Sequence, residues 1–326
     1  MRFFPGFLAA IFFALCAHAA PSTLIVPAAD GAYPLAAEVG WRFEQRAAIP
    51  TRIQRTNTRD ALRAFCEGRN KWVLVARPML RDELDACTAG RVRFVEIPFA
   101  LDAVIMVTTR ATEFKSDMTR DKLVRLWRQT AGAPRERWSQ IDPVWPNTLV
   151  TLAAPPKGSS VLDYLERNGI GEPLRSDYQV FADLDQIPMY VAYKRNWMGF
   201  VEYSYFRENR NKLYGFPFSN QPGVKAVPPT PAAIVAGEYP ALIKPLLMYV
   251  EIDALADVTV EKFAATLLEL AADLHNDERR TDVHYLPLPE TAYPAARERL
   301  RTRTLGSRFN GEFVQGARLL ELLNKR

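Results

Sequence analysis

A chain of 326 residues, of which 48% are hydrophobic and 24 are prolines, is long enough for one large domain or two ordinary ones. Its formal net charge of +5 suits a small anionic ligand. The charge is too weak to indicate nucleic-acid binding, and no basic segment is interleaved with aromatic residues.

The first 20 residues have the pattern of a secretory signal peptide. Arg2 precedes an apolar run from Phe3 to Cys16, and Ala17-His18-Ala19 has the small-x-small spacing of a cleavage site. A lipoprotein site at Cys16 would need a small residue where Leu15 stands, so we expect cleavage and release. Loss of Arg2 with the signal lowers the net charge from +5 to +4. No later apolar run approaches the roughly 20 residues that span a bilayer.

Two cysteines, Cys66 and Cys87, remain after cleavage. In an oxidising compartment an even pair indicates a disulfide, here one that closes a loop of about 20 residues. The alternative is a pair of free, buried thiols.

The first third of the mature chain alternates between strand and helix patterns. A helix from Pro34 would bury an apolar face of Leu35, Val39, Trp41 and Phe43, and a second helix would be capped within Thr56–Thr58 and end at Gly68. Strands are predicted at Thr23–Pro27 and Trp72–Ala76, and a further helix at Arg81–Thr88.

The run Val95–Thr109 is rich in β-formers and too long for one ordinary strand, so it could pass from one lobe to another. The remaining expected elements are a helix at Thr119–Gln129, strands at Gly199–Tyr203 and Leu246–Val250, a long helix capped by Thr259, a helix at Pro294–Arg303 and a C-terminal helix. Strands that alternate with helices predict an α/β chain.

The most informative segment follows the apolar strand Leu149–Ala154. The loop Pro155–Ser160 contains Lys157, Gly158 and two serines, and a short helix begins directly after it. Unbonded N–H groups and the dipole at a helix start favour an anion, and Gly158 would let the backbone approach it closely. The alternative is that the serine is only a helix cap.

Two other strand–loop–helix junctions resemble this one, at Ala28–Pro34 and Thr56–Asp60. If these two junctions and Lys157–Val161 open into one cleft, their helix starts converge on one ligand, as happens at strand ends in open α/β sheets.

Catalysis is not indicated. The mature chain has only His275 and His284, neither in a catalytic motif, and Ser159 has no G-x-S-x-G setting. No Cys/His cluster or Asp-rich loop indicates a metal. We therefore expect neither an enzyme nor a metal or other cofactor.

Short motifs occur in order along nearly the whole mature chain. They are Phe65–Gly68, Ala76–Met79, Glu96–Val104, Met118–Leu123, Trp138–Asp142, Met198–Tyr203, Pro229–Pro231, Gly237–Pro240, Lys244–Leu246, Tyr285–Pro289 and Gly306-Ser307. Taken together and in this order, these segments resemble the phosphate-binding proteins of bacterial ABC phosphate importers, the PstS family.

The resemblance implies an α/β chain with the two-lobe, type II periplasmic-binding-protein fold. Each lobe would be a mixed sheet flanked by helices, with the ligand cleft between the lobes. After a signal peptide at 1–20, lobe 1 would comprise 21–102 and 239–326, and lobe 2 would comprise 103–238. A periplasmic monomer that delivers its ligand to an ABC permease is implied.

The resemblance places ligand-binding positions at Ala32, Tyr33, Thr58, Ser159 and Ser160. The backbone N–H of Tyr33 and the hydroxyls of Thr58 and the two serines would donate to the ligand.

Other positions depart from the family pattern. A threonine hydroxyl is lost at Val161, a glycine-rich turn is replaced by Arg59-Asp60-Ala61, and an aspartate that accepts the proton of phosphate falls near Ala76. Arg77 and Lys157 would replace an arginine that falls on Pro155.

The implied function is capture of a small tetrahedral oxyanion, inorganic phosphate first, for an ABC importer. Without the aspartate, sulfate-like anions are no longer excluded. The alternative is a diverged relative with an eroded site, which acts as a sensor or interaction module or binds another ligand.

Overall fold

A computed structural model describes residues 23–111, 114, 116–128, 136–170, 174–239, 242–273 and 285–325. The predicted signal peptide, His275, His284 and the predicted end of a helix at Gln129 lie outside these residues.

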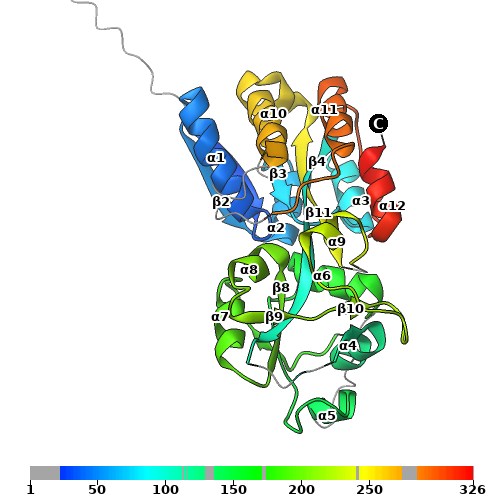
Figure 1. The fold of residues 1–326 in the computed structure, drawn as a ribbon. Helices are drawn as coiled ribbons and strands as arrows, with labels where there is room; N and C mark the ends of the chain where they lie inside the picture. The colour runs from blue at the N-terminus through cyan, green and yellow to red at the C-terminus, as the bar shows by residue number, and fades with distance from the viewer. Residues whose placement is uncertain are drawn as a thin grey trace, which may run out of the picture.

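The chain folds into two α/β lobes, drawn one above the other in Figure 1. The first lobe contains a mixed sheet in the order β2-β1-β3-β11-β4. Strands β2 and β3 are parallel to β1, whereas β11 is antiparallel to both β3 and β4. The strands are β1 (Leu24–Ala29), β2 (Thr51–Thr56), β3 (Trp72–Val75), β4 (Phe94–Thr109) and β11 (Ile243–Glu251).

Helices from both ends of the chain cover the first sheet (Figure 1). They are α1 (Tyr33–Ala47), α2 (Thr58–Cys66), α3 (Arg81–Ala89), α10 (Val258–Asp273), α11 (Ala292–Thr302) and α12 (Gly316–Asn324), with a 3₁₀ turn at Ile252–Ala256. Among the described residues, no helix has the length and apolar character needed to cross a membrane.

The second lobe continues the sheet from β4 in the order β8-β6-β7, and β9 also pairs with β4. Its strands are β6 (Thr151–Ala154), β7 (Gln179–Val180), β8 (Trp197–Glu202) and β9 (Leu213–Gly215), with a separate pair of β5 (Met118–Thr119) and β10 (Phe218–Ser219). Its helices are α4 (Arg120–Trp127), α5 (Trp138–Ile141), α6 (Ser160–Leu165), which continues as a π-helix over Glu166–Ile170, α7 (Gln186–Tyr193) and α8 (Tyr203–Glu208). Helix α9 (Pro231–Val235) lies on the return path to β11.

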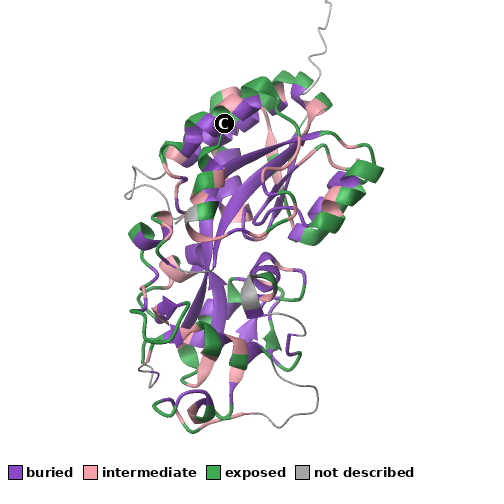
Figure 2. Ribbon diagram, turned by 90° about the vertical axis from the view of Figure 1, so that its right-hand side faces the viewer, coloured by how far each residue is buried: buried purple, intermediate pink, exposed green. Residues whose placement is uncertain are grey.

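Strand β4 belongs to both sheets. Its first part, Phe94–Ala103, pairs with β11, and the next part, Val104–Val107, pairs with β8. All 16 of its residues are buried, and Figure 2 shows this buried strand running through both lobes. The long β-rich run predicted from the sequence is therefore one strand that passes from lobe to lobe.

Three details differ from the sequence prediction. Leu35, Val39 and Phe43 are buried in α1 at a spacing of four, but Trp41 is 61% exposed because it lies off that face. The edge strand β2 was not predicted, because its half-exposed sequence TRIQRT has little apolar content. Helix α10 is capped by Asp257, which accepts the N–H of Thr259 at 2.8 Å, so Thr259 is not the cap.

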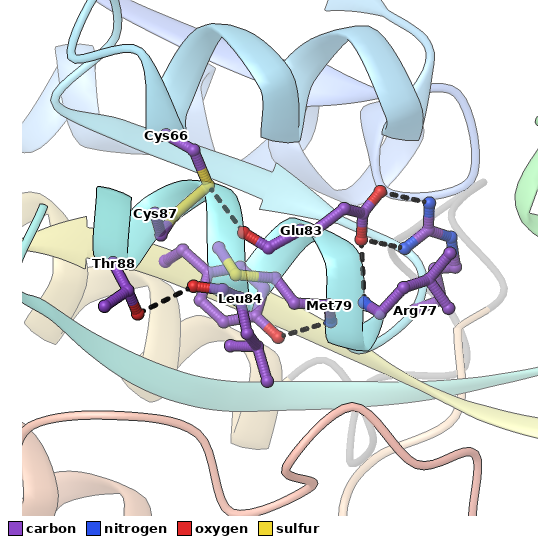
Figure 3. The surroundings of a disulfide bond; sticks show 9 residues. Cys66, Arg77, Met79, Glu83, Leu84, Cys87 and Thr88 are labelled. Carbon is purple, nitrogen blue, oxygen red and sulfur yellow. Dashed lines mark hydrogen bonds and ion pairs between the residues drawn. A yellow bond between two sulfur atoms is a disulfide. The ribbon is translucent and has the colours of Figure 1, made fainter. Parts of the chain in front are cut away.

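The structure contains the predicted disulfide between Cys66, the last residue of α2, and Cys87 in α3 (Figure 3). Their Cα atoms are 4.2 Å apart. Glu83 precedes Cys87 by one turn of α3, and its carbonyl oxygen lies 3.3 Å from the Cys66 sulfur. The disulfide thus fixes α3 against α2 close to the side chain of Glu83.

Replacing both cysteines with serine should lower the free energy of unfolding by about 3 kcal/mol, because the disulfide restricts a short loop in the unfolded chain. Urea unfolding of the oxidised protein and of the double variant measures the difference. A variant with the midpoint of the wild type would contradict the expectation, and reduction of the wild type should reproduce the loss.

Candidate functional site

A cavity of about 230 Å³ lies between the two lobes. The first lobe contributes the loop after β1 and the start of α2, and the second contributes the loop between β6 and α6 and a segment before α7. The lining residues are Asp30, Gly31, Asn57, Thr58, Arg59, Asp60, Pro155, Pro156, Lys157, Gly158, Ser159, Ser160, Val161, Ala182 and Leu184. All three strand–loop–helix junctions singled out in the sequence therefore meet at one cavity.

The cavity is lined by hydrogen-bond donors at helix starts. Asn57 caps α2 by accepting the N–H of Asp60 at 2.8 Å, and Ser159 caps α6 by accepting the N–H of Leu162 at 3.3 Å. The N–H groups that precede these have no partner in their own helices. The Thr58 side chain is 3% exposed, and its hydroxyl makes no hydrogen bond to the described part of the chain. Such a lining favours an acceptor-rich anion.

Four of the seven predicted ligand positions line the cavity: Thr58, Lys157, Ser159 and Ser160. The Ser159 hydroxyl serves as the cap of α6, which confirms the cap interpretation, and a role in anion binding stays a prediction.

The other three predicted positions, Ala32, Tyr33 and Arg77, lie outside the lining. The N–H groups of Ala32 and Tyr33 donate to Ala29 and Asp30 within the turn, at 2.8 and 3.3 Å. The ring of Tyr33 lies beneath the guanidinium of Arg55, 5.3 Å from its carbon.

Arg77 is fully buried and joins the two lobes. Its guanidinium donates to both carboxylate oxygens of Glu83 in α3 at 2.7 Å (Figure 3), and to Asp163 in α6 at 2.8 Å. Burial alone would lower the pKa of Arg77, but hydrogen bonds and charge attraction from Glu83 and Asp163 raise it. Arg77 was expected either to face the ligand or to form a surface ion pair with Glu83 or Asp82; the pair with Glu83 exists, but it is buried.

A second buried charge cluster lies behind the cavity where the two sheets meet. Lys244 of β11 contacts the carboxylate of Glu202 on β8, donates to the Ser160 hydroxyl at 3.1 Å, and lies 3.8 Å from Asp102 on β4. Ser160 in turn donates to Glu202 at 2.8 Å. The cluster therefore connects the cavity-lining Ser160 to three strands.

Two carboxylates in this cluster share one lysine. Asp102 accepts the N–H groups of Ala103 and Tyr203 through one oxygen, and its other oxygen has no hydrogen-bond partner. Burial raises the pKa of Asp102 from its ordinary 3.8 to about 7; Lys244 opposes this rise and Glu202 adds to it.

Gly31 allows the loop after β1 to pack closely against this cluster. A Cβ atom at position 31 would lie 2.2 Å from a carboxylate oxygen of Glu202, so only glycine allows this approach. Glu202, Lys244 and Asp102 lie in segments that resemble PstS, but no role was predicted for them, because the cluster forms only when strands distant along the chain come together.

Ion pairs also cross between the lobes at the edge of the cavity. Arg55 on β2 bonds Asp30 at 2.7 Å and lies 3.5 Å from Asp183 of the second lobe. Burial raises the pKa of Asp30, although Arg55 opposes this effect. Within the described ranges, no group of His, Cys, Asp and Glu side chains is arranged to hold a metal ion.

Two α/β lobes joined by a shared strand, with a donor-lined cavity between them, define a ligand-binding protein of the two-lobe class. Residues 17–272 match the PBP superfamily domain, and the chain therefore belongs to the PBP superfamily.

Similar proteins agree with this class and support the resemblance to PstS. The protein SphX of Synechococcus elongatus is 28% identical over 300 residues, which cover 90% of this chain and 87% of SphX. The phosphate-binding protein PstS of Staphylococcus haemolyticus is 22% identical over 70% of this chain and 69% of its own length. A solved structure of a possible phosphate-binding protein from Planctomyces limnophilus superposes with a TM-score of 0.63 at 25% identity, covering 87% of this chain and 99% of that one.

Replacing Arg77 with methionine should destabilise the protein by about 3–5 kcal/mol, because Asp163 and Glu83 would keep buried charges without their partner. Arg63→Met is the matched control, since Arg63 pairs with Asp60 at an exposed position and should change stability little. Urea unfolding of both variants gives the comparison. Equal midpoints for the two variants would contradict a central role for the buried pair.

Stability should also depend on pH through Asp102. Because folding raises its pKa, the folded state holds this proton more tightly than the unfolded chain, and its contribution is full below about pH 4 and lost as pH rises through about 7. Asp102→Asn cannot titrate. The unfolding free energy of the variant relative to wild type should therefore increase by at least about 1 kcal/mol between pH 5 and pH 8. A constant difference across this range would refute the assignment.

Proposed function

We propose that this chain is an extracytoplasmic solute-binding protein that captures a small tetrahedral oxyanion, inorganic phosphate first, and presents it to an ABC importer. The observation that carries the proposal is the meeting of three strand–loop–helix junctions at one interlobe cavity. The unbonded N–H groups at the starts of α2 and α6 and the hydroxyls of Thr58 and Ser159 are donors, and such a set suits an anion with several acceptor oxygens.

The relatives favour phosphate over the alternative of an eroded sensor or interaction module. PstS of Staphylococcus haemolyticus is a phosphate-binding protein and resembles this chain over 70% of its length. The departures from the family pattern remove individual donors, an acceptor and a charge, but they leave the three junctions in place. They are therefore expected to tune affinity instead of removing the site.

The remaining parts of the proposal concern the setting. The chain would act in the periplasm after loss of residues 1–20, as a monomer whose partner is an ABC permease. We propose the lobe boundaries predicted above, with 21–102 and 239–326 in lobe 1 and 103–238 in lobe 2. Closure of the lobes around the ligand would be the state that the permease recognises. No catalytic step is included.

Within the site, the Thr58 hydroxyl would bind the anion directly. Ser160 would contribute its backbone N–H, because its hydroxyl already donates to Glu202 and accepts from Lys244. Ser159 would shape the loop as well as donate, and Lys157 would add charge at the opening. The turn after β1, with Ala32 and Tyr33, would contribute backbone groups to the ligand site. Arg77 would act by holding Asp163 and the start of α6 in place.

Isothermal titration of the mature protein with phosphate and with sulfate tests the function. We expect phosphate binding, and we expect Thr58→Val to weaken it roughly 10- to 150-fold, because a hydrogen bond to a charged group is worth about 1.5–3 kcal/mol. Thr88→Val is the control, since the Thr88 hydroxyl bonds Leu84 on the exposed face of α3. Absence of binding to either anion at millimolar concentration would overturn the proposal.

A further inference from the structure

The basic side chains around the cavity differ in how closely they are paired with carboxylates of the protein. Arg77 is bonded to Glu83 and Asp163, Lys244 contacts Glu202, and Arg55 is bonded to Asp30. These three cations are each paired with at least one carboxylate. They stabilise the junction between the lobes, and little of their charge is available to a bound anion.

Arg59 is different. It stands in the first turn of α2, lines the cavity, and makes no hydrogen bond to the described part of the chain. Its nearest carboxylate oxygen, on Asp163, is 3.6 Å away and belongs to a side chain that Arg77 already bonds. Arg59 and Asp163 therefore form an ion pair that is longer than a hydrogen bond, and the N–H donors of the guanidinium remain available to a ligand.

The Arg59 side chain nevertheless reaches across the gap between the lobes. It extends from the first lobe to Gly158 in the loop before α6, where an added Cβ atom would lie only 3.2 Å from its Nε. Gly158 also has a φ of +85°, a conformation that favours glycine, so a glycine at this position both suits the turn and leaves room for the guanidinium. Lys157, the other lining cation, has no such contact within the described residues.

We propose that Arg59 is the residue that binds the anion by charge in this protein, and that it determines affinity by bridging from α2 to the ligand as the lobes close. This inference rests on the proposed function. A planar guanidinium with unbonded donors matches two oxygens of a tetrahedral oxyanion at once, which a lysine ammonium cannot do. In the sequence, Arg59 stands out only as part of the segment that replaces a glycine-rich turn, and the charge was expected on Arg77 and Lys157.

Phosphate titration of four proteins tests the inference: wild type, Arg59→Gln, Arg59→Lys and Arg63→Gln. Arg63 lies one turn further along α2, pairs with Asp60, and provides a control with the same change in net charge. We expect Arg59→Gln to weaken phosphate binding roughly ten-fold or more, with a smaller dependence of affinity on salt. Arg59→Lys should recover only part of the affinity, and Arg63→Gln should stay within about two-fold of wild type.

The outcomes separate the two proposals. If wild type binds phosphate and Arg59→Gln binds it equally well, the role of Arg59 is refuted while the function stands. If Arg59→Gln and Arg63→Gln weaken phosphate binding equally, the effect comes from the net charge of the protein, and direct contact between Arg59 and phosphate is refuted. If wild type binds no phosphate, the proposed function fails first. Urea unfolding of each variant shows that it is folded before titration.

Discussion

The structure depends on buried charges that fix the position of one lobe relative to the other. Arg77 connects α3 of the first lobe to α6 of the second, and Lys244 connects β11 to Glu202 on β8. Both cations are fully buried, where an unpaired charge would cost several kcal/mol, so each requires its partners on the other lobe at hydrogen-bonding distance. The same residues position the start of α6, because Asp163 and Ser160 lie in its first turn. The geometry of the cavity thus follows from contacts that are not themselves part of its lining.

Much of the fold could be predicted from the sequence, because its signals are local. Apolar runs marked β1, β3, β4 and β11, and caps or apolar spacing marked α1, α2 and α10. The length of the run Val95–Thr109 indicated a strand that could pass from one lobe to the other. The edge strand β2 was missed because its sequence has too few apolar residues to mark a strand. The start of α10 was misassigned because Asp257, two residues before Thr259, caps the helix in place of the threonine.

The site could be predicted only in part. Loop chemistry identified Thr58, Lys157, Ser159 and Ser160, because serine, threonine and glycine at helix starts have a direct physical meaning. The state of each charge could not be predicted, since it depends on partners distant along the chain. Arg77 is paired with Asp163, which lies 86 positions further along the chain, and Arg59 approaches the other oxygen of the same carboxylate only to 3.6 Å. The raised pKa of Asp102 likewise arises only when β4, β8 and β11 come together.

The position of β11 in the middle of the first sheet has a consequence for how the chain reaches this structure. Strands β3 and β11 are neighbours, although Val75 and its partner Leu247 are separated by about 170 residues, and pairings that distant form slowly. During synthesis the apolar edge of β3 therefore has no partner until most of the polypeptide has been made. The first lobe therefore cannot complete its sheet until the strands of the second lobe have been made.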